Sequence, residues 1–422
     1  MEKLRSRERV ARALSHRQPD RVPVDLGNSS WTGIHARAVA ALRDLYGLPQ
    51  RPIKVWEPYQ FLGEVDDDLL DAMGVDTVRF QSPGTSFGFR NENWKEWKTW
   101  WGQTVLVSEH FRTAPHPESG IVIFPEGDTT APPSGHMPDG GYFFDTIVRQ
   151  EPFDADNPRL ADNLEEFKPI ADGDLQFLAA EAKRLADSGR APIAGFGGTA
   201  LGDIFAVPAP WMKRPRGIRD ISEWYMSLVT RPDFVERIFD YQLEVGIENL
   251  TRVHQAVGDV PLTVQLCGAD FGTQESQFCS LATFKKLWAP RYRRLNAWVH
   301  EHTNWKTMKH SCGSVRVFID QFIECGFDVL NPVQISAKDM DPAALKRDFG
   351  DRIAFWGGGI DTQRTLPYGT PAQVREEALR LLDIFAPGGG YVFSTVHNVM
   401  ANIPVANLAA LIAAVKEFNG VR

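Results

Sequence analysis

The feature that most constrains the fold is a repeated alternation of short apolar runs and helix-like segments towards the end of the chain. The apolar runs cover residues 305–308, 327–330, 353–356 and 391–393. The helix-like segments between them cover residues 315–325, 342–349 and 371–385. Short apolar runs that alternate with helical periodicity are typical of consecutive βα units. The sequence therefore predicts a parallel sheet here, with a helix after each strand.

The same alternation occurs earlier in the chain. Further strand candidates cover residues 22–26, 75–80, 192–196 and 261–266. The total is about eight, which is the number of strands in a closed (β/α)8 barrel. We therefore predict an α/β protein with a single (β/α)8 TIM barrel domain over residues 1–422. In such a barrel the polar residues that follow each strand meet at one face.

A stretch at about residues 91–169 interrupts the alternation. It contains a proline- and glycine-rich tract and short β-like runs, and it holds four tryptophans: Trp94, Trp97, Trp100 and Trp101. We interpret it as an inserted β-rich, Trp-rich subdomain, because so many aromatic side chains need a packed environment. It could form a lid or rim over a site, or a surface elaboration without chemistry.

Composition excludes several classes of protein. The chain of 422 residues has 43% hydrophobic residues, 24% charged residues and a formal net charge of −8. A negative charge disfavours general binding of nucleic acid. No apolar run is long enough to span a membrane, and the charged start lacks a signal core. Four cysteines in so long a chain do not make a disulfide framework, so we expect a reducing, cytoplasmic location.

Two histidines and a cysteine at predicted strand ends suggest a metal site. His310 and Cys312 are two residues apart on one predicted extended segment, so their side chains face the same way. His397 follows the last predicted strand. Imidazole and thiolate together favour Zn²⁺, and three protein ligands leave a fourth position open. The alternative is a hydrogen-bonded structural histidine and a buried, unreactive cysteine.

Three further polar residues follow predicted strands. Asp270, Gln334 and Asp361 could orient a ligand, bind substrate or act as acid or base. For the two aspartates the alternative is helix capping or turn stabilisation, which is strong for Asp361 because a helix-like segment follows it.

Several stretches together resemble the uroporphyrinogen decarboxylase-like superfamily over nearly the whole chain. They are residues 9–24, 270–274, 310–313, 327–334, 356–363 and 386–398. This resemblance implies a (β/α)8 barrel. The decarboxylases carry an Arg-Gln-Ala-Gly-Arg segment and a Phe-Ser-Asp element, whereas this chain has Asp-Leu-Gly-Asn-Ser-Ser-Trp at residues 25–31 and Phe-Gln-Ser-Pro at residues 80–83. Without those arginines a highly anionic substrate would be poorly held.

The other branch of the superfamily, corrinoid-dependent methyltransferases similar to the methylcobamide:coenzyme M enzymes, binds zinc through a His-x-Cys motif and a later cysteine. His310 and Cys312 match that motif, and His397 stands where the later cysteine is found, followed by Pro404 and Asn407. The resemblance therefore implies His310, Cys312 and His397 as zinc ligands. It also implies that Asp270, Gln334 and Asp361 orient ligands and acceptor.

The implied function is zinc-dependent transfer of a methyl group between a corrinoid (methylcobamide) and a thiol, folate or methoxy-type substrate. The chain lacks the D-x-H-x-x-G motif of corrinoid binding, so we expect a separate corrinoid protein as partner. For the oligomeric state, a homodimer is one candidate. Two alternatives are open: a decarboxylase-like lyase, for which Arg79, Arg90 and Arg219 are the candidate basic residues, and a non-catalytic corrinoid- or tetrapyrrole-binding protein.

Overall fold

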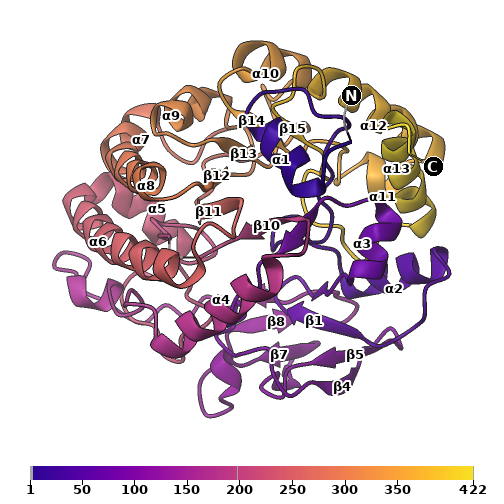
Figure 1. Ribbon diagram of the computed structural model, residues 1–422. Coiled ribbons are helices and arrows are strands. Elements are labelled where there is room, and N and C mark those ends of the chain that lie inside the picture. Colours follow the sequence, from indigo (N-terminus) through magenta and orange to yellow (C-terminus); the bar gives the residue numbers. More distant parts are fainter. Residues whose placement is uncertain (1–2, 197, 422) are drawn as a thin grey trace.

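The centre of the molecule is a curled, parallel, seven-stranded sheet (Figure 1). The computed structural model describes residues 3–196 and 198–421. Along the sheet the strand order is β15-β14-β13-β12-β11-β10-β3. The strands are β3 (Thr77–Arg79), β10 (Ala191–Ala194), β11 (Thr263–Cys267), β12 (Lys306–His310), β13 (Val329–Asn331), β14 (Ala354–Trp356) and β15 (Tyr391–Val392). The predicted α/β barrel class is confirmed.

A short segment near the N-terminus joins the two edges of this sheet. Val24 forms a parallel bridge with Phe393 beside β15, and the Val24 carbonyl accepts the Asp76 N–H at 2.8 Å beside β3. The segment therefore occupies the place of the eighth strand. We expected a regular strand over residues 22–26, but only the isolated bridge forms. The Pro23 carbonyl accepts the Phe393 N–H, but Pro23 has no N–H of its own to donate. This limits the backbone hydrogen bonding between this segment and the edge of the sheet.

Helix α1 lies across one end of the barrel, where it contacts β3, β10 and β15, and the other helices surround the sheet on its outer side (Figure 1). They are α1 (Ser6–Leu14), α2 (Ala36–Leu45), α3 (Asp67–Met73), α4 (Asp172–Leu185), α5 (Ile221–Thr230), α6 (Pro232–Val257), α7 (Leu281–Leu287), α8 (Ala289–His302), α9 (Ile319–Glu324), α10 (Pro342–Phe349), α11 (Thr365–Tyr368), α12 (Pro371–Phe385) and α13 (Val405–Phe418). The ends of α10 and α12 coincide with the predicted segments. Asp341 and Thr370 cap their N-termini, and a proline follows each cap, which is a strong helix-start signal.

Two small four-stranded sheets lie beside the barrel, at the bottom of Figure 1. Their strand orders are β2-β1-β5-β4 and β6-β7-β8-β9. The strands are β1 (Ile53–Glu57), β2 (Leu62–Gly63), β4 (Lys95–Lys98), β5 (Thr104–Val107), β6 (Thr113–Pro115), β7 (Ile121–Ile123), β8 (Gly135–Met137) and β9 (Asp145–Thr146). The first sheet thus combines β4 and β5 with two strands that precede residue 91.

Aromatic packing explains how the tryptophan-rich stretch is held. The rings of Trp97 and Trp101 lie 5.8 and 5.5 Å from that of Phe61, which is fully buried.

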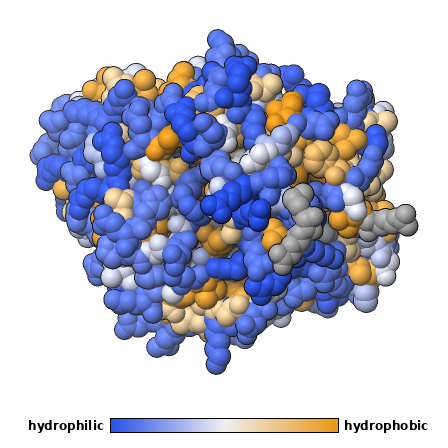
Figure 2. All heavy atoms as spheres, turned by 45° about the horizontal axis from the view of Figure 1, so that its top comes forward, coloured by the Kyte–Doolittle hydropathy of each residue, from blue (hydrophilic) through white to orange (hydrophobic). Residues whose placement is uncertain are grey.

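Hydrophilic residues predominate on the face shown in Figure 2, with hydrophobic ones in separate patches. Among the described residues, no helix has both the length and the apolar character needed to cross a membrane.

Candidate metal centre

A cavity of about 690 Å³ opens where the central strands end. One group of lining residues follows β10, β11 and β12, and a second group consists of residues 30, 31, 57, 59, 60, 62, 145, 146 and 148. The first group belongs to the barrel, whereas the second includes parts of the small sheets. Carboxyl ends of barrel strands are where the active sites of such folds lie.

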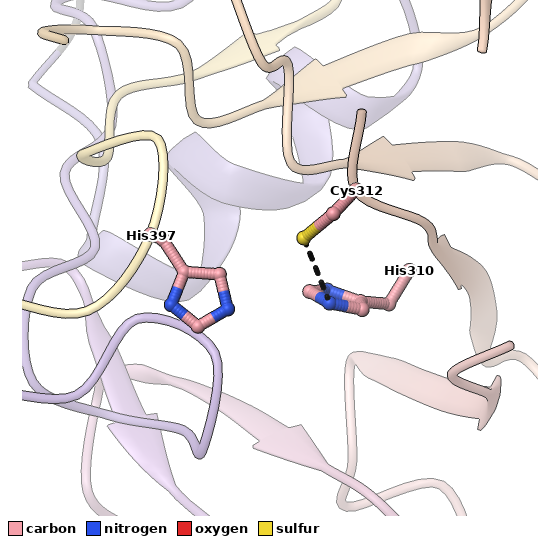
Figure 3. Close-up of side chains that lie close together, drawn as sticks. All are labelled: His310, Cys312 and His397. Atoms are coloured by element: carbon pink, nitrogen blue, oxygen red, sulfur yellow. Dashed lines mark hydrogen bonds between the residues drawn. The ribbon is translucent and has the colours of Figure 1, made fainter. Parts of the chain in front are cut away.

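Three metal-binding side chains meet at this cavity. His310 ends β12, Cys312 follows it, and His397 lies in the loop after β15. One ligand atom from each lies within 4.8 Å of the others. His397 lies across a gap from His310 and Cys312 (Figure 3), and Cys312 Sγ lies 3.7 Å from His310 Nε2. The structure therefore brings His397 next to His310 and Cys312, from which it is distant in sequence.

The orientation of the His310 ring is set by Asn331, at the end of β13. The Asn331 amide nitrogen donates to the Trp356 carbonyl at 3.0 Å, so its oxygen faces His310. That oxygen lies 2.7 Å from His310 Nδ1, which must then carry the proton. His310 Nε2 is consequently left with its lone pair towards Cys312. A histidine ligand held in this way by a neighbouring acceptor is the usual arrangement at metal sites.

The turn that carries Cys312 is fixed by two side chains from neighbouring loops. The Asp270 carboxylate accepts the Cys312 N–H, and the Gln334 side-chain oxygen accepts the Gly313 N–H, both at 2.7 Å. Gly313 has φ +85°, and a Cβ there would lie 2.3 Å from the Gly272 carbonyl oxygen. Only glycine fits this conformation next to that backbone.

Burial controls the protonation of the cluster. Desolvation lowers the pKa of both His310 and His397 to about 4, so both rings are neutral at pH 7. The pKa of the Cys312 thiol is raised, first by burial and then by the charges of Asp270 and Asp203. Neutral imidazoles are the form that binds metals, and a bound cation would offset the cost of the thiolate.

The donor set and its spacing fit a zinc ion. Zinc binds nitrogen at about 2.0 Å and sulfur at about 2.3 Å, so ligand atoms around tetrahedral zinc lie about 3.4 to 3.6 Å apart. The 3.7 Å between Cys312 Sγ and His310 Nε2 is close to this value. A His₂Cys set supplies three ligands and leaves one position for an exogenous group.

The other predicted residues lie in different surroundings. Asp270 lines the cavity, whereas Gln334 and Asp361 are absent from its described lining. Gln334 acts on the Cys312 turn through the Gly313 N–H. The Asp361 carboxylate instead accepts the backbone N–H groups of Gln363 and Arg364, which is the turn-stabilising alternative considered from the sequence.

Two charged residues near the centre were missed in the sequence. Asp203 lines the cavity, and its pKa is raised to about 7 by desolvation and by Asp270. It lies in the loop after β10, so the rule that singled out Asp270 would also have found it. Lys309 is fully buried on β12, and its Nζ donates to the Ala269 and His310 carbonyls. Its strand reads Lys-Thr-Met-Lys-His, so no apolar alternation marked Lys309 as buried.

The chain matches the family model described as uroporphyrinogen decarboxylase (URO-D) over residues 146–418, and it belongs to that family of enzymes. A uroporphyrinogen decarboxylase from Sodalis glossinidius is 35% identical over 75 residues, which is 18% of this chain and 20% of that protein. The methylcobamide:CoM methyltransferase MtaA from Methanosarcina barkeri is 28% identical over 205 residues, or 48% of this chain and 53% of that protein. The chain thus spans about half or less of the length of these curated relatives.

A solved structure has the same fold over the whole length. It is a methyltransferase from Methanosarcina mazei, with a TM-score of 0.55 and 17% sequence identity. The match covers 98% of this chain and 99% of that one. The stretch at residues 91–169 therefore lies within the length matched by this fold.

Proposed function

We propose that this protein is a zinc-dependent methyltransferase that moves a methyl group between a corrinoid and a thiol. The observation that carries the proposal is the meeting of His310, Cys312 and His397 at the wall of the cavity. The similarity to methylcobamide:CoM methyltransferases supports the same reaction class. A corrinoid protein would present the methylated cofactor at the cavity mouth.

In the proposed reaction, the sulfur of the thiol forms a bond to the methyl carbon while the carbon–cobalt bond breaks. The electron pair of that bond stays on cobalt, and the thiol proton leaves to solvent. Bound zinc would supply a lowered thiol pKa. His310 and His397 hold neutral nitrogen donors there at pH 7, and Asp270 and Gln334 fix the turn that presents Cys312.

The cavity does not suit the polyanionic substrate of a decarboxylase. Among the described residues, no lysine or arginine lines it. Arg219 is buried in a contact with Glu166 at 2.8 Å, and Arg90 pairs with Asp174. The Arg79 guanidinium lies 4.1 Å from the Trp56 ring centroid and outside the cavity wall. The three basic residues considered from the sequence are therefore engaged elsewhere.

Metal content tests the proposal first. We expect about one zinc per chain by mass spectrometry of the purified protein, and loss of zinc in Cys312→Ala. The matched control is Cys279→Ala, which removes a half-buried thiol from outside the cluster and should keep the metal. Zinc-loaded wild type should then demethylate methylcobalamin when a thiol is supplied, as followed by the visible spectrum. Wild type that takes up no zinc when zinc is supplied would contradict the proposed function.

A further inference from the structure

The described wall of the cavity is rich in negative groups. It includes four carboxylates, which belong to Glu57, Asp145, Asp203 and Asp270, and no lysine or arginine. Two cations lie behind the wall. Lys309 is fully buried and donates to two backbone carbonyls, and Arg79 stacks on Trp56. They offset part of the negative charge, but neither belongs to the described lining of the cavity; Arg79 lines a smaller neighbouring pocket that shares Trp31 and Gln265 with it.

Within the described part of the chain, Asp203 is a wall carboxylate without a paired cation. Its Oδ1 accepts the Phe205 N–H at 2.8 Å, and none of the ion pairs among the described residues includes it. Desolvation and the charge of Asp270 both disfavour its ionised form, which raises its pKa to about 7. A carboxylate in such a place is stabilised when a cation enters the cavity.

Two buried polar atoms of the wall also lack partners. Thr199 and Trp31 are 8% and 6% exposed, and the hydroxyl of the first and the indole N–H of the second have no hydrogen-bond partner among the described residues. Both residues line the cavity. Buried polar groups are rarely left unpaired, so these atoms point to a ligand. A hydroxyl can accept a hydrogen bond from an ammonium group.

Aromatic rings complete the surroundings. Tyr59 and Phe205 both line the cavity, with their ring centroids 4.9 Å apart. Ring faces attract organic cations and do not attract anions. Carboxylates, a free hydroxyl and aromatic faces are thus combined in one cavity, next to the three metal-binding side chains.

We propose that the thiol bound in this cavity carries an ammonium group. Its sulfur would lie at His310, Cys312 and His397, and its ammonium group would be held by the carboxylate side of the wall, with Asp203 as the main partner. This inference rests on the proposed function and adds the substrate class. A thiol with a sulfonate or carboxylate head would meet four carboxylates and no lysine or arginine among the described wall residues.

Three thiols that share the unit HS–CH₂–CH₂– test the charge of the head group directly. They are 2-aminoethanethiol, 2-mercaptoethanol and 2-mercaptoethanesulfonate. We expect calorimetric titration of the zinc-loaded protein at pH 7.5 to give a Kd at least tenfold lower for the ammonium thiol than for the sulfonate thiol, with the hydroxyl thiol between them. Equal or tighter binding of the sulfonate thiol would overturn this inference and leave the proposed function standing. Failure of all three thiols to bind would overturn both.

A variant then assigns the preference to Asp203. In Asp203→Asn the ratio of the Kd of 2-mercaptoethanesulfonate to the Kd of 2-aminoethanethiol should fall at least fivefold. The Kd of 2-mercaptoethanol should stay within twofold of the wild-type value. A merely structural change would not produce this pattern. Asp139→Asn, which neutralises an exposed carboxylate outside the described cavity wall, is the matched control and should keep the ratio. If Asp203→Asn does not fold, Glu57→Gln tests the same wall. An unchanged ratio in the folded variant would overturn the role of Asp203.

Discussion

At the scale of single residues, the candidate metal centre depends on side chains that orient the metal-binding residues through hydrogen bonds. Asn331 sets the tautomer of His310 because its amide nitrogen is already bonded to the Trp356 carbonyl. Asp270 and Gln334 accept the N–H groups of Cys312 and Gly313. His310 and Cys312 are thus oriented by hydrogen bonds from residues at the ends of β11 and β13.

We expect Gly313→Ala to destabilise the protein and to lower its zinc affinity. The residue has φ +85°, and a Cβ would come within 2.3 Å of the Gly272 carbonyl oxygen and 2.6 Å of the Thr273 oxygen. The backbone must then shift at the residue next to Cys312, at a cost of roughly 1–3 kcal/mol or more. Urea unfolding and zinc competition with a chelator measure the two effects.

Gly102→Ala is the control for this change. Gly102 has φ +86°, but a Cβ there would meet no atom within 4 Å. It therefore adds the conformational strain without the clash, and zinc affinity should stay at the wild-type value. If both variants lose stability equally and both keep zinc, the close approach of Gly272 has no role in shaping the site.

At the scale of elements, strands of the barrel are joined by charged residues at the face opposite to the cavity. Asp328 precedes β13 and accepts hydrogen bonds from His300 at 2.9 Å, from Lys306 at 2.8 Å and from the Thr307 N–H at 2.8 Å. It thereby links α8, β12 and β13. Burial by itself would raise the pKa of Asp328, but the hydrogen bonds from His300 and Lys306 hold the pKa below its usual value.

We expect Asp328→Asn to lower the free energy of unfolding by about 1–3 kcal/mol at pH 7, because charged hydrogen bonds are lost. The folded-state pKa lies below the unfolded value of about 3.9. The stabilisation is therefore fully present above pH 4 and is lost as the pH falls through the folded pKa. Unfolding curves at pH 7, 5 and 3 should show the difference from wild type narrowing only at the lowest pH. Asp187→Asn, at an exposed position, should change little at any pH.

At the scale of the whole molecule, the barrel is closed by residues from opposite ends of the chain. The segment at Val24 pairs with Phe393, and the fully buried Asp76 accepts hydrogen bonds from Arg9, Arg21 and the Val24 N–H. Arg9 is itself 3% exposed. The carboxylate of Asp76, just before β3, thus holds both α1 and the segment around Val24.

Asp76→Ala should cost about 3–5 kcal/mol of stability, since it leaves the buried Arg9 with only one carboxylate partner, Asp20. Thermal and urea unfolding would measure the loss. Asp172→Ala provides the contrast, because it removes an 86% exposed partner of Arg252 and should cost less than about 1 kcal/mol. Similar losses in the two variants would mean that Asp76 does not hold the closure together.

The amino-acid sequence by itself determined the βα alternation and the positions of polar residues at strand ends. Apolar runs of strand length and helices with proline after a capping residue are local signals, so β12 to β15, α10 and α12 could be predicted from short windows. The same rule placed His310, Cys312, His397 and Asp270 at one face, and the structure brings these residues together.

Only the tertiary structure decided which strands share a sheet and which polar residues face the cavity. β1 pairs with β2 nearby in sequence but also with β5, which is distant in sequence, so no local pattern could place β1 and β2 in one sheet with β4 and β5. Asp203 and Asp361 each accept a backbone N–H from the residue two positions later, yet of the two only Asp203 belongs to the described lining of the cavity. Their local sequences allow either role. The packing of neighbouring loops, which sets burial and charge around each carboxylate, selects between them.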